Sequence, residues 1–176
     1  IKLTSDEKID FSRYKYFYAS YVANSKKIDK AKKIVKSAIK LYPRNLLLNQ
    51  YKLDLDKNKS ISAFDCKKEA HVISEILYIT ANALSSQSIY PLSNFYLNLA
   101  KFLNDDFHSY NTLLAENFYK IDNYTKAKKI YNNLSKQGKA FSWYSAKQLA
   151  KIFLEEEKKD KALKLVSDTY NSLDVK

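Results

Sequence analysis

Residues 23–45, ANSKKIDKAKKIVKSAIKLYPRN, combine a regular apolar stripe with eight basic residues. The apolar residues recur at intervals of three and four, which is the spacing of one face of an α-helix. They are Ala31, Ile34, Val35, Ala38 and Ile39. The lysines fall on the opposite side. The stretch is therefore predicted to form an amphipathic helix whose alanines face other helices and whose lysines face solvent.

A pair of small residues twelve apart, Ala19 and Ala31, recurs along the chain. The further pairs are Ala81 and Ser93, Ala115 and Ala127, and Ala150 and Ala162. A large apolar residue follows the first member of each pair by three, at Val22, Leu84, Phe118 and Phe153. Another follows the second member by four, at Val35, Leu97, Tyr131 and Val166. Small residues let the two helices of a hairpin approach closely, and large ones fill the gaps between neighbouring hairpins.

This pattern resembles the tetratricopeptide repeat, a helix–turn–helix unit of 34 residues, because the last three second members are 34 and 35 residues apart. The closing proline of that family appears only as Pro43, its later small position is filled by Leu134 and Thr169 in the last two units, and its early tryptophan is absent. The resemblance implies an all-α, right-handed α-solenoid in a single domain, residues 1–176. Its units would be about 12–45, 74–107, 108–141 and 143–176, with a degenerate unit at 46–73 whose second helix is shortened or missing.

Local signals predict where helices begin and end. Asp29, Thr125 and Asp160 are expected to cap the second helix of their units, and Pro91 is expected in a first turn. Gly138 is expected to end the third hairpin.

The helix predicted near residues 91–103 carries a second apolar stripe, formed by Leu92, Phe95, Leu99 and Phe102. A helix that is apolar on nearly all sides is usually buried. Either the irregular segment 46–73 folds over this stripe, or a partner or a second copy of the chain covers it, in which case the chain self-associates.

The formal net charge of +12 comes almost entirely from lysine, since Arg13 and Arg44 are the only arginines. Lysine, asparagine, isoleucine, tyrosine and phenylalanine have codons rich in A and T, so a low-GC genome accounts for the same bias. Arginine is the better fork for phosphate, and nucleic acid is therefore not predicted as a partner. No apolar run reaches the roughly 20 residues that span a bilayer. The chain starts at Ile1, so we expect a mature form or a fragment, similar to bacterial members of the family and located in the cytoplasm or, with an upstream signal, in the cell envelope (periplasm).

No arrangement of residues typical of catalysis is present. His71 and His108 lack a metal-ligand spacing, and Cys66 has no second cysteine with which to form a disulfide. A chain with one glycine has no phosphate-binding loop. The sequence predicts no enzyme, no cofactor and no metal site.

In the family that the sequence resembles, the first helices line a concave groove that holds a peptide or a partner domain. We call the positions counted from the paired small residues the frame. By frame position, the family's groove residues correspond to Tyr16, Ser20 and Asn24, then Tyr78, Asn82 and Ser86, then Thr112, Glu116 and Tyr119, and finally Lys147 and Lys151. Polar groups interleaved with tyrosines suit an extended peptide. Tyr16 and Ser20 stand where members that clamp a chaperone's C-terminal carboxylates have Lys and Asn, which disfavours that subtype. The resemblance thus implies a protein–protein interaction scaffold.

The lysines of the second helices support an alternative function. They recur at two offsets, at Lys30, Lys126 and Lys161 and at Lys33, Lys129 and Lys164, and would form a ridge on the convex face. Such a ridge would dock the module on an anionic surface, RNA or membrane headgroups, without sequence specificity and with strong salt dependence. We favour the scaffold, because helical repeats that read RNA use the first-helix face, where this chain has few basic groups.

Overall fold

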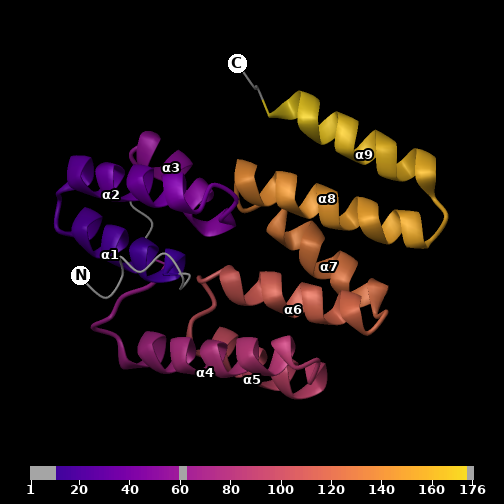
Figure 1. Ribbon diagram of the computed structural model, residues 1–176, viewed down its shortest axis with the longest axis horizontal. Coiled ribbons are helices and arrows are strands. Elements are labelled where there is room, and N and C mark those ends of the chain that lie inside the picture. The colour runs from indigo at the N-terminus through magenta and orange to yellow at the C-terminus, as the bar shows by residue number, and fades with distance from the viewer. Residues whose placement is uncertain (1–10, 60–62, 174–176) are drawn as a thin grey trace. The chain divides into compact units, whose positions relative to one another are not determined.

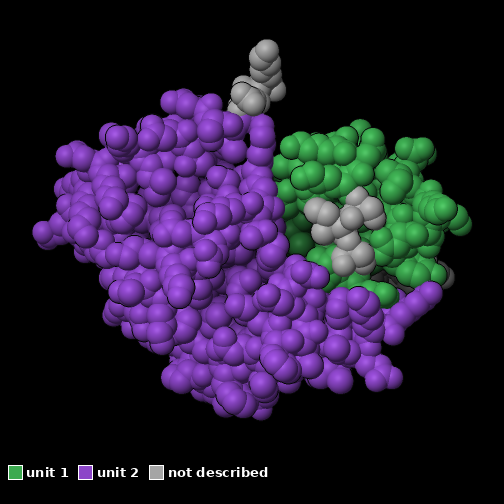
Figure 2. Space-filling model, turned by 180° about the vertical axis from the view of Figure 1, so that it is seen from behind, with its two compact units in different colours: residues 1–65 green, residues 66–176 purple. Residues whose placement is uncertain are grey.

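The computed structural model describes residues 11–59 and 63–173, and the chain divides into two compact units, residues 1–65 and 66–176 (Figure 2). All regular secondary structure in the described ranges is helical, which confirms the all-α prediction there. The first unit contains α1 (Ser12–Asn24), α2 (Ile28–Leu41) and α3 (Leu46–Asp56). The second contains α4 (Glu69–Ser86), α5 (Tyr90–Leu103), α6 (Ser109–Lys120), α7 (Tyr124–Leu134), α8 (Lys139–Glu155) and α9 (Lys159–Ser172) (Figure 1).

The same three-residue turn joins α1 to α2, α4 to α5, α6 to α7, and α8 to α9. Its middle residue has a positive φ in every case: 60° at Lys26, 63° at Ser88, 55° at Asp122 and 59° at Glu157. The next backbone N–H donates to the carbonyl of the large apolar residue of the frame, at Val22, Leu84, Phe118 or Phe153, over 2.8–3.2 Å. This is the bond that closes a Schellman motif. The large apolar residue of the frame therefore supplies the carbonyl that closes the first helix of each pair.

The small residues of the frame lie between paired helices. Of the eight, six have no exposed surface, and Ala150 and Ala162 are also buried. In the α4–α5 pair the Ser93 hydroxyl donates to the Ala81 carbonyl oxygen at 2.7 Å, so a side chain of one helix touches the backbone of the other. Such an approach requires small residues at both positions, because a larger side chain would hold the helices apart.

In the first unit, α3 packs against both α1 and α2. The Asn45 amide before α3 donates to the Ser12 hydroxyl at 2.8 Å, and the ring of Phe17 on α1 stacks on Phe64 at 4.1 Å. The end of α3 repeats the turn described above, with Asn58 at a φ of 53°. No helix follows it in residues 63–68, so a second helix is missing from the described part of this segment.

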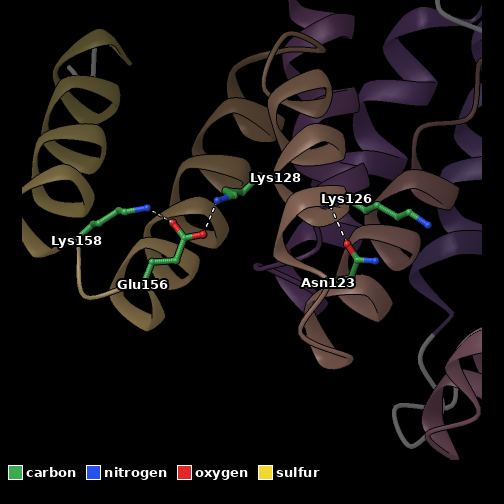
Figure 3. Close-up of polar contacts among 5 residues, drawn as sticks. All are labelled: Asn123, Lys126, Lys128, Glu156 and Lys158. Carbon is green, nitrogen blue, oxygen red and sulfur yellow. Dashed lines mark hydrogen bonds and ion pairs between the residues drawn. The ribbon is translucent and has the colours of Figure 1, made fainter.

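In the second unit a buried amide ties the first three helices together. Asn117 of α6 donates to Ser93 and Asn94 of α5 at 2.8 and 2.9 Å, and it accepts from Ser85 of α4 at 2.6 Å. Farther along the unit, Glu156 accepts from Lys128 of α7 and from Lys158, which links α7 to the turn between α8 and α9 (Figure 3).

The predicted helix boundaries need correction at four residues. Asp29 and Asp160 lie in first turns and are not caps, and Thr125 lies inside α7, whose cap is Asn123, accepting from the Lys126 N–H (Figure 3). The shared turn places the cap on its third residue, earlier than predicted. Gly138 does not end α7, which stops at Leu134; it precedes α8 with a φ of 138° that favours glycine. Pro91 lies in the first turn of α5 as predicted.

The second apolar stripe of α5 is exposed. Leu92, Phe95, Leu99 and Phe102 have exposed fractions between 38% and 87%. Residues 66–73, the part of the irregular segment 46–73 that belongs to this unit, do not cover the stripe, so these residues do not bear out the expectation that the segment folds over it. Coverage by a partner or by a second copy stays a prediction.

Candidate partner-binding surface

Two of the three groove residues predicted in the first unit are core residues. Tyr16 and Ser20 are buried, and the Tyr16 ring meets Tyr51 of α3 edge-on with 4.9 Å between centroids. Burial raises the pKa of Tyr16, so its hydroxyl stays protonated. Because α3 closes this side of α1, these two positions face the interior of the unit. Asn24, at the end of α1, is exposed.

In the second unit, α4 presents a polar end. Asn82 and Ser86 are exposed, and the Ser86 hydroxyl donates to the Ala83 carbonyl of its own helix at 2.7 Å. Tyr78 is half-buried, with its ring tilted against Tyr110 of α6 at 5.5 Å. Tyr78 therefore contributes to packing as well as to the surface.

The structure joins the predicted residues of α6 to α8. Tyr144 of α8 donates its hydroxyl to Glu116, and Tyr119 donates to Glu155 at 3.4 Å. Thr112 turns back to its own helix, donating to the Ser109 carbonyl at 2.7 Å. Glu116 and Tyr119 thus belong to one continuous polar face shared by two first helices, whereas the Thr112 hydroxyl is occupied.

The phenols of this face remain protonated. Burial, followed by the charge of Glu116, raises the pKa of both Tyr144 and Tyr131, and burial together with Glu155 raises the pKa of Tyr119. A protonated phenol donates a hydrogen bond, and the neighbouring carboxylates accept. The face therefore offers directed hydrogen bonds and ring surface for binding, and it presents no activated nucleophile.

Lys147 and Lys151 are exposed on α8, and the Lys147 ammonium lies 5.7 Å from the centroid of the Trp143 ring. The attraction between the cation and the ring restricts where the ammonium can lie. Tyr144, like Trp143, was missed by sequence reasoning. It could have been found, because Tyr144, Lys147 and Lys151 are spaced by three and four residues and so share one face of a helix.

The lysines proposed as a convex ridge are all exposed. Two of them also pack against aromatic rings: the Lys126 ammonium lies 5.1 Å from the Phe118 centroid, and that of Lys161 lies 4.7 Å from Phe153. Both rings belong to the large apolar residue whose carbonyl closes a first helix. The aliphatic stems of these lysines therefore cover apolar surface, and their ammonium groups are attracted to the faces of the rings. Both contacts are a structural role.

A polar cleft of about 320 Å³ lies between the α5–α6 junction and the end of α7, lined by Lys101, Asp105, His108, Asn111 and Gln137 among others. Burial lowers the pKa of His108, so the imidazole is neutral near pH 7. His108 precedes α6 but its side chain does not cap the helix. The lining mixes both signs of charge and favours no particular ligand.

Across residues 11–59 and 63–173, no group of three His, Cys, Asp or Glu side chains is placed to hold a metal ion. The helices in these ranges are all too short or too polar to cross a membrane. Comparison of the sequence with protein-family models and with curated proteins gives no match.

Proposed function

We propose that the chain is a helical-repeat scaffold of the tetratricopeptide type, forming a right-handed solenoid, and that its second unit binds a protein partner through the first-helix face. We define this face by α4, α6 and α8. One observation carries the proposal: the small positions of each frame are buried between helices, whereas Asn82, Glu116, Lys147 and Lys151, at groove positions, are exposed. This separation of buried small positions from exposed groove positions in the second unit supports the proposal.

The chemistry of this face suits an extended peptide. Asn82 and Ser86 of α4 supply groups that bond a peptide backbone, and Tyr119 of α6 supplies a ring. Glu116 and Lys151 carry opposite charges on neighbouring first helices, so the favoured partner segment carries both signs of charge. Such complementarity sets the register and orientation of a bound segment.

A change of charge at two positions of this face tests the proposal. The variant N82R/K151E changes two exposed side chains, and the control N132R/K164E changes two exposed residues of α7 and α9 in the same way. Proteins captured from a lysate of the cells that make the chain are quantified for both. We expect the first variant to lose captured partners by at least about 10-fold, equivalent to about 1.4 kcal/mol, and the control to retain them. Equal capture by the unchanged chain, by N82R/K151E and by N132R/K164E would contradict the proposal.

Exposure of Lys30, Lys33 and their equivalents supports the alternative, docking on an anionic surface. Its test is co-sedimentation with vesicles rich in anionic lipid, and a gel shift with single-stranded RNA, both at about 0.15 M salt. Binding that the variant K126E/K129E abolishes would favour the alternative. We expect no binding at that ionic strength, because two of these lysine positions already pack on rings.

A further inference from the structure

The α1–α2 hairpin has an open cleft of about 450 Å³. It lies on the side of α1 opposite Tyr16, the residue that contacts Tyr51 of α3. Its walls are mostly apolar, formed by Tyr14 and Tyr18 of α1 and by Ile34, Ala38 and Leu41 of α2, with Lys15, Lys33 and Ser37 at the rim. Three large side chains here are exposed although they are apolar or aromatic: Tyr14 by 45%, Tyr18 by 37% and Leu41 by 56%. No helix of the described first unit covers this surface.

The chain itself shows what occupies the same surface elsewhere. In α1 the exposed tyrosines stand five and one residues before Ala19 and two after it, at Tyr14, Tyr18 and Tyr21. The equivalent positions around Ala115 and Ala150 are Tyr110, Leu114 and Asn117 on α6, and Ser145, Leu149 and Ile152 on α8. All six are buried.

Each of those two buried faces receives the helix before it. The preceding second helix, α5, packs on α6, and Asn117 bonds directly to it. In the same way α7 packs on α8. The α1–α2 cleft is therefore a surface of the kind that accepts a helix in this chain, and it is left open.

The charge around the cleft selects the kind of helix. Lys15 and Lys33 line it, and Lys30 and Lys40 lie on the same side of α2, one and two turns from Lys33. Among residues 11–59, no carboxylate lines the cleft, and Asp29 is the only acidic residue of α2. An apolar stripe flanked by Glu or Asp would bury the exposed tyrosines and Leu41 while its carboxylates met the lysines. A second copy, carrying the same +12 charge, is disfavoured.

We propose that the α1–α2 cleft is a docking site for an acidic amphipathic helix. The site is distinct from the first-helix face of the second unit, and the proposal does not depend on a partner bound there. The recognised features are Leu, Ile or Phe at intervals of three and four, and carboxylates on both sides of that stripe.

Three labelled peptides of about 18 residues, long enough to be helical, test the chemistry by fluorescence anisotropy with the full chain at about 0.15 M salt. The first has a leucine stripe flanked by glutamates, the second replaces every glutamate by lysine, and the third scrambles the first so that the stripe is lost. We expect the first to bind at least about 10-fold more tightly than either of the others. No binding of the first up to about 1 mM, or equal binding of the scrambled peptide, would overturn the proposal.

Matched variants place the site. L41S changes an exposed leucine of the cleft, and L163S changes a leucine of α9 that is 70% exposed. K33E and K164E change lysines at the same frame position of α2 and α9. We expect L41S and K33E to weaken the acidic peptide by about 10-fold or more, with unchanged helical content by circular dichroism, and K33E to improve binding of the lysine peptide. Equal effects of L163S and K164E would overturn the assignment. N82R/K151E, which tests the other surface, should leave this binding unchanged.

Discussion

Asn117 offers the sharpest test of how the second unit is held together. Its amide makes three hydrogen bonds, with Ser85 on α4 and with Ser93 and Asn94 on α5, and its side chain is almost fully buried. The substitution N117A removes all three bonds and leaves a small cavity at the junction of three helices.

The expected loss follows from what each partner can do afterwards. A buried hydrogen bond contributes about 1 kcal/mol net, so three amount to about 3 kcal/mol. Ser93 keeps its bond to Ala81, and Ser85 is partly exposed and reaches water, whereas the buried Asn94 amide oxygen loses its donor. We therefore expect N117A to lower the free energy of unfolding by about 2–4 kcal/mol.

Urea unfolding measures this loss through two signals. Fluorescence of Trp143, the single tryptophan, reports on α8, and far-ultraviolet circular dichroism reports on all helices. The control N132A removes an exposed amide of α7 and should change stability by less than about 0.5 kcal/mol. In a double-mutant cycle with S93A, the coupling should be at least about 0.5 kcal/mol. A loss for N117A no larger than that of N132A would refute the reasoning.

Three further predictions concern turns and titrating groups. Replacing Glu157, whose φ of 59° strains a residue with a Cβ, by glycine should stabilise the α8–α9 pair by up to about 1 kcal/mol, whereas S167G inside α9 should destabilise it by about as much; thermal unfolding distinguishes the two. Lys128 and Lys158 lower the pKa of Glu156 to about 2. The ionised carboxylate therefore stabilises the folded state above the unfolded pKa of roughly 4.3, and this stabilisation is lost as the pH falls towards 2. The free energy of unfolding of E156Q, measured over the same acid range, should lack this loss. Burial raises the pKa of Tyr144. Absorbance at 295 nm should therefore show fewer ionised tyrosines near pH 11 in the folded protein than in the unfolded chain. The free energy of unfolding should fall as the pH rises above about 10, and Y144F should reduce that fall.

The spacing of small and large residues predicted much of the local structure. Ala115 and Ala127 are buried because a helix pair needs a small residue at each crossing, and that need is already visible as a spacing of twelve. The large apolar residue whose carbonyl accepts the closing bond of each first helix, such as Phe118, also stands at a constant spacing, although that role was not predicted. The caps were misplaced because the left-handed residue of each turn is Lys, Ser, Asp or Glu, and none of these gives the signal that glycine would.

The candidate surfaces depended on contacts that spacing alone does not specify. Tyr16 and Ser20 share the frame positions of Thr112 and Glu116, yet they are buried, because α3 returns onto α1 in the first unit and no pattern announces that return. The hydrogen bonds between Tyr144 and Glu116 and between Tyr119 and Glu155 join α8 to α6, and spacing does not specify these pairs. The sequence by itself determined which side of each helix is apolar, because that follows from a 3.6-residue period. Tertiary structure decided which apolar sides are covered, because coverage depends on a second helix arriving at the right place, and the α1–α2 cleft is a side that no helix of the described first unit covers.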